Sequence, residues 1–153
     1  MACCRPGPNL PEQIPARPDT GGGGEQVTVT DANLVLGRLL PDAFLGGEMQ
    51  LDVAAAEQAL GRLAEAMGCT MLEAAQGVIR IANEHMARAL RTISVQRGLD
   101  PAGFTLMSFG GAGGLHVCAL ADALGMTRAL VPVHGGVLSA LGMLVATPGR
   151  AVG

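Results

Sequence analysis

Residues 105–133 read TLMSFGGAGGLHVCALADALGMTRALVPV, and this stretch decides the fold class. The mostly apolar run 105–109 predicts a buried strand, and the glycines of 110–114 predict a tight loop after it. Residues 115–124 predict a helix that a glycine ends, and residues 127–133 predict a second strand. Strand, glycine loop, helix and strand together make a βαβ unit. We therefore expect an α/β protein with a large share of helix.

Two long helices are expected upstream of this unit. Asp52 is a good N-cap for a helix over 53–67, which the following glycine ends. Residues 70–73, Thr-Met-Leu-Glu, form a capping box that opens the longest helix, running to about Arg97. The dipeptide Asp100-Pro101 then prevents the helix from continuing.

Shorter elements are expected at both ends of the body. Thr30 or Asp31 is expected to cap a short helix that runs through Leu39. A turn is expected at 45–47, Leu-Gly-Gly, and a last helix at 138–145. Within the long helix, apolar residues spaced by three and four form a stripe between 75 and 93, and an exposed stripe there would favour a partner chain.

Composition excludes several classes of protein. Aromatic residues make up 2% of the chain, all ten basic residues are Arg, and the net charge is −3 with a pI near 5.5. A surface that stacks nucleic-acid bases needs aromatic rings, and a Schiff-base site or a P-loop needs Lys. The acidic balance provides no electrostatic footprint for DNA or RNA. We expect no nucleic-acid partner.

The first 26 residues differ from the rest, with five prolines and the run Gly21–Gly24. We expect a disordered or out-of-frame tail here, with no apolar core like that of a signal peptide. The most apolar long window, 129–147, is broken by proline and glycine and does not suit a membrane span. The four Cys lack the paired spacing of a zinc site or a disulfide framework. We expect a cytoplasmic protein with no metal site and no membrane partner.

The glycine loop is the strongest chemical signal. Glycines that lead into a helix bring bare backbone N–H groups and the positive end of a dipole to one point, where a phosphate or nucleotide can approach. A Rossmann fingerprint would need glycine where His116 stands, and 127–138 holds no acidic residue for a ribose. The glycines also suit a tight turn with close helix–strand packing. Both interpretations, ligand binding and local packing, stay open.

Four polar residues are further candidates. His116 follows the loop and could touch a ligand, and Asp31 could orient a substrate, although a cap or a satisfied polar role explains each. Asn83 and His85 lie at the edge of the apolar stripe and suit either a cleft or the surface. No Ser-His-Asp spacing or carboxylate pair is specific enough to identify chemistry alone.

Several stretches in the right order, together covering about residues 27–147, resemble the hydantoinase A/5-oxoprolinase family, which includes acetone carboxylase subunits. They are VTVTDANLVLGRL (27–39), FLGG (44–47) with Leu51-Asp52, IANEHMARALR (81–91) with RGLDP (97–101), FGGAGGLH (109–116) and PVHGGVLSALG (132–142). The resemblance implies an actin/hexokinase-like ATPase fold, of which this chain would supply part of the second lobe. It also implies ATP and Mg²⁺ as cofactors and opening of a cyclic amide such as 5-oxoproline or a hydantoin.

For individual residues, the resemblance implies nucleotide contacts from Gly110, Gly111, Ala112 and Gly113. Asp31 and His116 are the candidate catalytic residues of the cleft. The family's phosphate-binding Asp-Gly-Gly-Thr segments do not occur, and Gly114 stands where the family usually has Pro.

We therefore expect a fragment that ends in a truncated stretch at 148–153, provides the adenosine side of the site and is inactive alone. In the full-length enzyme the substrate would be a small cyclic amide. The alternative is an interaction module that completes a partner chain carrying the phosphate-binding lobe.

Overall fold

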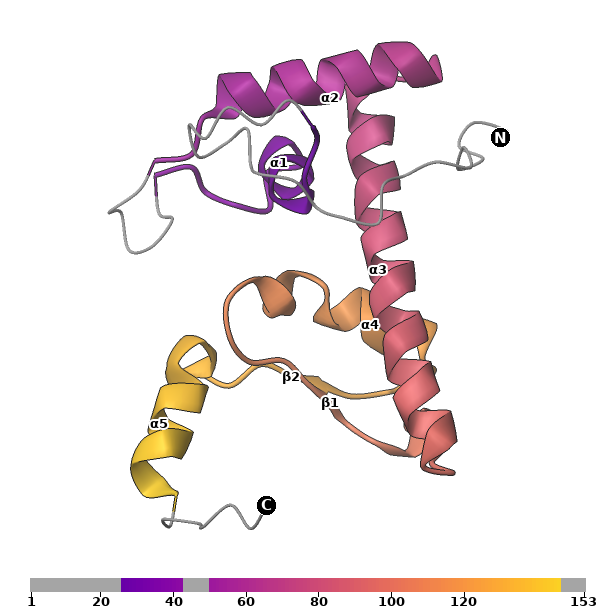
Figure 1. The fold of residues 1–153 in the computed structure, drawn as a ribbon, viewed down its shortest axis with the longest axis vertical. Helices are drawn as coiled ribbons and strands as arrows, with labels where there is room; N and C mark the ends of the chain where they lie inside the picture. The colour runs from indigo at the N-terminus through magenta and orange to yellow at the C-terminus, as the bar shows by residue number, and fades with distance from the viewer. Residues whose placement is uncertain (1–25, 43–49, 147–153) are drawn as a thin grey trace, which may run out of the picture. The chain divides into compact units, whose positions relative to one another are not determined.

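A computed structural model of the protein describes residues 26–42 and 50–146 (Figure 1). The chain divides into two compact units, residues 1–82 and residues 83–153, and the helix α3 contributes to both. The elements are, in order, α1 (Val29–Val35), α2 (Val53–Met67), α3 (Met71–Gln96), η3 (Pro101–Gly103), β1 (Leu106–Met107), η4 (Ala112–Leu115), α4 (Val117–Ala123), β2 (Ala129–Leu130), η5 (Gly135–Val137) and α5 (Leu138–Val145). The protein is a helix-rich α/β chain with a small two-stranded sheet.

The first helix, α1, begins earlier than the sequence suggested. Thr28 is its N-cap, not Thr30 or Asp31, because the Thr28 hydroxyl accepts from Asp31 N while the Asp31 carboxylate accepts from Thr28 N. This reciprocal pair is a capping box with Asp31 at its third position. The helix ends at Val35 rather than Leu39, and Gly37 follows with a φ of +68°.

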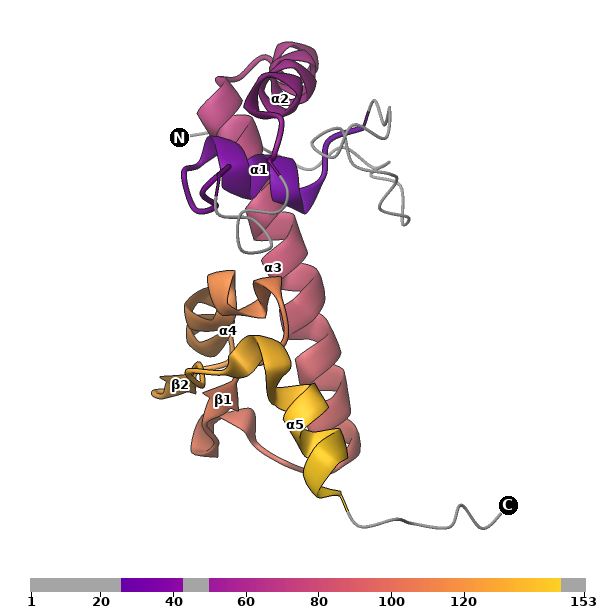
Figure 2. The ribbon, with the colours of Figure 1, turned by 90° about the vertical axis from the view of Figure 1, so that its left-hand side faces the viewer.

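The second helix, α2, has the bounds that its caps predict. Asp52 accepts a hydrogen bond from Ala55 N at 2.9 Å, and Gly68 closes the helix in the left-handed conformation at φ +64°. α1 and α2 lie against each other in both views (Figures 1 and 2). The expected turn at 45–47 lies outside the described residues.

Alanine dominates the core of the first unit. A cluster of buried residues joins α1, α2 and the start of α3, and consists of Ala32, Leu60, Ala64, Ala74, Ala75 and Ile79. Small side chains let helix backbones approach closely, so a chain with few aromatic residues still buries a core. The apolar stripe of α3 is covered over most of its length: Ala75 and Ile79 are buried and the next members are half-buried, whereas Ile93 is exposed.

α3 starts at the predicted capping box. Glu73 accepts from Thr70 N at 2.9 Å and from Thr70 Oγ at 2.8 Å, while Glu73 N donates to Thr70 Oγ. These bonds hold the pKa of the Glu73 carboxyl below its ordinary value of 4.5, the backbone bond being the larger cause. The helix continues to Gln96, one residue short of the expected end.

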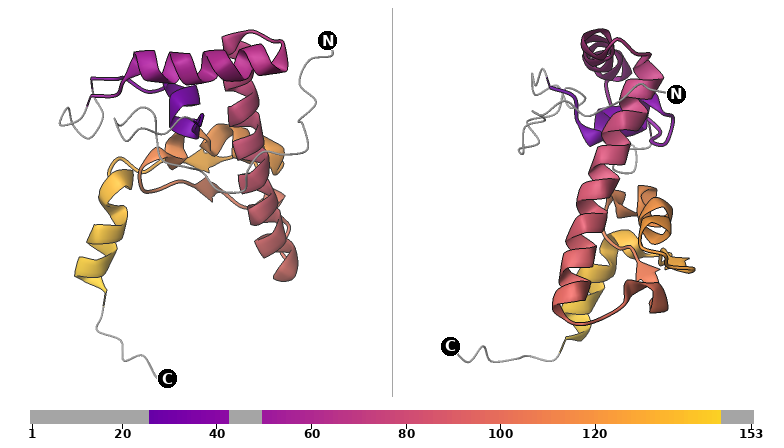
Figure 3. Two further views of the ribbon diagram at one scale, coloured as in Figure 1. Left: turned by 45° about the horizontal axis from the view of Figure 1, so that its top comes forward. Right: turned by 90° about the vertical axis from the view of Figure 1, so that its right-hand side faces the viewer.

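The second unit contains the βαβ unit. β1 and β2 are parallel, with Leu106 opposite Ala129 and Met107 opposite Leu130, and α4 packs beside them (Figure 3). The prediction of a buried strand at 105–109 is wrong in extent and burial. Only Leu106–Met107 is strand, Leu106 is half-buried and Met107 is exposed. Among the described residues, α4 packs against both strands, while Met107 of β1 and both residues of β2 stay exposed.

The helix expected over 115–124 is shorter and begins differently. A 3-10 turn over Ala112–Leu115 comes first, and α4 begins only after His116. Glycines stabilise a helix poorly, and the tighter turn accommodates them. The last helix, α5, has the predicted bounds. In the described part of the chain, no helix has both the length and the apolar character that crossing a membrane requires.

Candidate functional site

The glycine loop lies at the surface of the second unit, between β1 and α4. All residues from Gly110 to Gly114 are exposed, and Gly110 has a φ of +92°, which favours glycine. Gly110 N donates to the carbonyl of Gly135 at 2.7 Å, so the loop is tied to the turn that follows β2. The backbone of the loop is therefore both accessible and held in place.

At Gly113, the missing Cβ leaves room for the Ser108 hydroxyl. A Cβ added at Gly113 would lie 2.6 Å from Ser108 Oγ, closer than side chains tolerate. At Gly114 an added Cβ would meet only Val131, at an ordinary 3.8 Å. The carbonyl of Gly113 accepts from His116 N at 3.1 Å, which closes the 3-10 turn.

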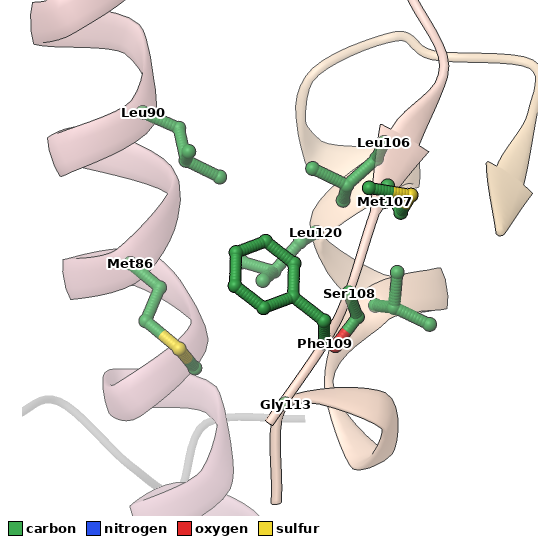
Figure 4. A pocket seen from close by; sticks show the side chains of 9 residues that line it. Met86, Leu90, Leu106, Met107, Ser108, Phe109, Gly113 and Leu120 are labelled. Carbon is green, nitrogen blue, oxygen red and sulfur yellow. The ribbon is translucent and has the colours of Figure 1, made fainter. Parts of the chain in front are cut away.

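An apolar cavity of about 220 Å³ adjoins the loop (Figure 4). Its walls come from α3, β1, the loop and α4, and consist of Met86, Leu90, Leu106, Met107, Ser108, Phe109, Gly113, Val117 and Leu120. The Phe109 ring lies between β1 and the α3 residues Met86 and Leu90. Of the residues that line the cavity, Ser108 has a polar side chain. Such a cavity suits a flat, largely apolar group with polar edges.

His116 is buried behind the loop, with 5% of its surface exposed. Its Nδ1 lies 2.7 Å from Oδ1 of Asn83 on α3, and because an amide oxygen accepts, the ring nitrogen donates. The bond links α3 to the residue between the 3-10 turn and α4. Of the two candidates on α3, Asn83 thus contacts the site and His85 is exposed. The arrangement suits positioning of the loop.

Asp31 belongs to the first unit, whereas the glycine loop and His116 belong to the second. The Asp31 side chain has no exposed surface. Its Oδ2 accepts from Thr28 N at 2.7 Å and Thr28 Oγ at 2.8 Å. Within the described residues, Oδ1 of Asp31 and Oδ1 of Asn33 are buried without a hydrogen-bond partner. The visible role of Asp31 is to cap α1.

The sequence identified Phe109 as the first residue of the matched glycine motif, but it did not single out Ser108 or Gly135 as part of this region. Ser108 is a polar residue within an apolar strand pattern, which is a signal that could have been noticed. Gly135 lies in a turn, and only the structure reveals its bond to Gly110. Within the part of the chain that the structure describes, Cys69 and Cys118 are not joined in a disulfide. Across residues 26–42 and 50–146, no three His, Cys, Asp or Glu side chains gather as a metal site would require.

Comparison with known proteins agrees with the resemblance seen in the sequence. A sequence model of the family described as Hydantoinase/oxoprolinase matches residues 7–151. Caprolactamase subunit alpha of Pseudomonas jessenii is 41% identical over 126 residues, covering 82% of this chain and 18% of that protein. 5-oxoprolinase 1 of Arabidopsis thaliana is 39% identical over 137 residues, covering 78% of this chain and 11% of that protein.

Solved structures share the fold. The crystal structure of the ATP-dependent caprolactamase from Pseudomonas jessenii matches with a TM-score of 0.74 and 41% identity over 82% of this chain and 18% of that chain. Nucleotide-free acetone carboxylase matches with a TM-score of 0.71 and 36% identity over 78% of this chain and 17% of that chain. The chain therefore spans less than a fifth of the length of these relatives. It belongs to the hydantoinase/oxoprolinase family.

Proposed function

We propose that this chain provides the adenosine side of the nucleotide site in an ATP-dependent enzyme that opens cyclic amides. The observation that carries the proposal is the exposed, glycine-rich backbone of 110–113 beside the apolar cavity of Phe109 and Ser108. In this account the chain forms part of the second lobe of an actin/hexokinase-like ATPase.

The shape of the region supports a nucleoside ligand. Without Cβ atoms at Gly110, Gly111 and Gly113, a ligand can approach the loop backbone closely. The Gly110 N–H and the Gly113 carbonyl already have partners within the chain, so they fix the shape of the loop. The adjacent cavity has aliphatic and aromatic walls, which suit the faces of a purine ring. The Ser108 hydroxyl and the loop backbone provide donors and acceptors for its edges.

Hydrolysis requires groups that these residues do not supply. Stabilising a transferring phosphoryl group takes a metal ion and preorganised donors around its oxygens. The sequence holds no Lys and no Asp-Gly-Gly-Thr segment. The described residues also offer no carboxylate cluster that fits Mg²⁺. Alone, the chain should bind adenosine weakly and hydrolyse no ATP.

We assign different roles to the two candidate catalytic residues, His116 and Asp31. His116 acts on the loop through its bond to Asn83, so we assign it a positioning role behind the nucleotide. A catalytic role for Asp31 stays a prediction, since its buried carboxylate caps α1. The cyclic amide itself would be chosen mainly by residues of the complete enzyme.

A chimera tests this function. The segment of Pseudomonas jessenii caprolactamase subunit alpha that matches this chain is replaced by residues 27–146, and ATP-dependent hydrolysis of caprolactam is measured. We expect activity in the chimera, none in the chain alone, and loss of activity with Gly113→Ala but not with Gly114→Ala. ATP hydrolysis by the isolated chain, or a folded chimera indifferent to Gly113→Ala, would contradict the proposal.

A further inference from the structure

The last helix, α5, is apolar around its circumference, yet the structure buries none of its residues. Leu141, Met143, Leu144 and Val145 are all exposed, with Leu144 at 84%. In Figure 1 the helix extends away from the two strands. Helices that are apolar on every side are found inside larger proteins, because water makes their exposure costly. Something is expected to cover α5.

The chain segment that leads into α5 is exposed in the same way. Val131 is exposed and Val133 is 95% exposed, directly after β2. From Ala129 to Val145 the sequence contains no Asp, Glu, Lys or Arg. Parallel sheets are almost always covered on both faces, and two strands alone are marginally stable. The uncovered region thus includes both the sheet and the helix.

We propose that α5 and residues 130–133 form a docking surface for the polypeptide that carries the remainder of a hydantoinase/oxoprolinase enzyme. The inference rests on the proposed function, and it names the surface through which the adenosine side joins the phosphate side. We call it the α5 surface. Its partner presents an uncharged, apolar face, because a charge buried against this surface would find no counter-charge.

Two observations select this partner over a second copy of the chain. The relatives are more than five times as long as the stretch that they share with this chain, so most of their fold lies outside it. The α5 surface also adjoins the glycine loop, since Gly135 at the start of η5 accepts a hydrogen bond from Gly110. A partner that covers residues 131–135 together with α5 therefore lies beside the loop. A second copy would bring a second adenosine side and no Asp-Gly-Gly-Thr segment.

The stripe of α3 between 75 and 93, which the sequence suggested for a partner, is not this surface. Ala75 and Ile79 of that stripe are already buried within the described residues, and Met86 and Leu90 are half-buried. The exposed apolar residues are concentrated instead in 130–145.

Binding in trans tests the proposal. Caprolactamase subunit alpha from Pseudomonas jessenii, with its matching segment deleted, is mixed with the full chain in the absence of nucleotide, and complex formation is followed by light scattering after gel filtration. Leu144→Glu and Val145→Glu place a charge on the α5 surface. Val95→Glu is the matched control, because Val95 and Val145 are both valines on helices with 73% exposure.

We expect a complex of one copy of each chain for the wild type and for Val95→Glu, and binding at least about tenfold weaker for the two α5 variants. No complex with the wild type, equal binding by all variants, or a homodimer that Leu144→Glu dissociates would each overturn the proposal. Hydrogen exchange provides a second measurement. Amides 139–145 should be protected in the caprolactamase chimera and fast in the chain alone, and equal rates would contradict the docking surface.

The outcome is separable from that of the proposed function. Gly113→Ala alters the loop and leaves the α5 surface intact, so it should dock like the wild type. Normal docking by a chain that fails to bind adenosine would overturn the nucleotide proposal alone. Adenosine binding without docking would overturn the α5 surface alone.

Discussion

Gly113 shows how one missing methyl group shapes the loop. Ser108 Oγ lies 2.6 Å from the position that a Cβ on residue 113 would take. Gly113→Ala should lower the free energy of unfolding by about 1–2 kcal/mol, because Ser108 must rotate or the loop must shift. Urea denaturation followed by circular dichroism measures the change.

Two further variants separate this clash from other effects. Gly114→Ala should be close to neutral, since its Cβ makes an ordinary contact with Val131. Adding Ser108→Ala to Gly113→Ala should restore most of the lost stability, because the double variant lacks the Ser108 Oγ that the new Cβ would meet. A double variant as unstable as Gly113→Ala would show that the Ser108 contact is not the cause.

The bond between His116 and Asn83 is the second test at the residue scale. Asn83→Ala removes the acceptor of a buried ring nitrogen, and such losses cost about 1–3 kcal/mol. His85→Ala, an exposed histidine on the same helix, should change stability by less than about 0.5 kcal/mol. The same urea titration compares them, and equal effects would remove the case for a positioning role.

Individual residues of the site were only partly predictable. The glycines of 110–113 were identified from sequence because consecutive glycines before a helix are a local signal. The partner of His116 is 33 residues away, and the Gly110–Gly135 bond likewise joins distant segments. Such pairs depend on tertiary packing, which no local pattern specifies.

At the scale of elements, two glycines of α2 should respond oppositely to the same substitution. Gly61 lies within the helix with open space around an added Cβ, so Gly61→Ala should raise stability by about 0.5–1 kcal/mol. Gly68 has a φ of +64°, so Gly68→Ala should lower stability by about 1 kcal/mol. Thermal unfolding gives both values, and a shared sign would contradict the assigned end of α2.

The start of α3 should be sensitive to acid. Glu73 has a lowered pKa in the folded protein, so its capping bonds contribute stability above its ordinary pKa of 4.5. That contribution is lost as the pH falls through the folded pKa. Glu73→Gln should keep the cap and lose this part of the acid destabilisation, because Gln also completes a capping box.

The measurement compares the unfolding free energy above and below pH 4.5 for the wild type, Glu73→Gln and Glu84→Gln. Glu84→Gln controls for the loss of an exposed carboxylate from the same helix. The wild type should lose more stability in acid than Glu73→Gln. An identical loss in both would rule out the capping box as the source.

Elements with strong caps were predicted well. α2 and α3 have bounds within one residue of the expected ones, because Asp52, Gly68 and the Thr70–Glu73 box act locally. α5 also has the expected bounds, although no side chain caps it. The start of α1 was misplaced because three neighbouring residues, Thr28, Thr30 and Asp31, are all suitable N-caps. The strands were predicted too long and too buried, since the length of a strand depends on what pairs with it and covers it.

At the scale of the whole molecule, a small helix-rich α/β fold presents an exposed glycine loop and an uncovered last helix. The family match and the fold of the relatives place the chain among hydantoinase/oxoprolinase proteins, while the stretch that it shares with them covers less than a fifth of their length. The exposed glycine loop and the uncovered helix α5 are both explained if further polypeptide completes the site.

Binding of adenosine by the glycine loop can be tested by a nuclear magnetic resonance titration of the ¹⁵N-labelled chain. Adenosine is added to millimolar concentration, with uridine as the control ligand. The amides of Gly110, Gly111, Ala112 and Gly113 should shift in a saturable way with adenosine and much less with uridine. Loop amides that stay in place, or that shift equally with both nucleosides, would contradict the account.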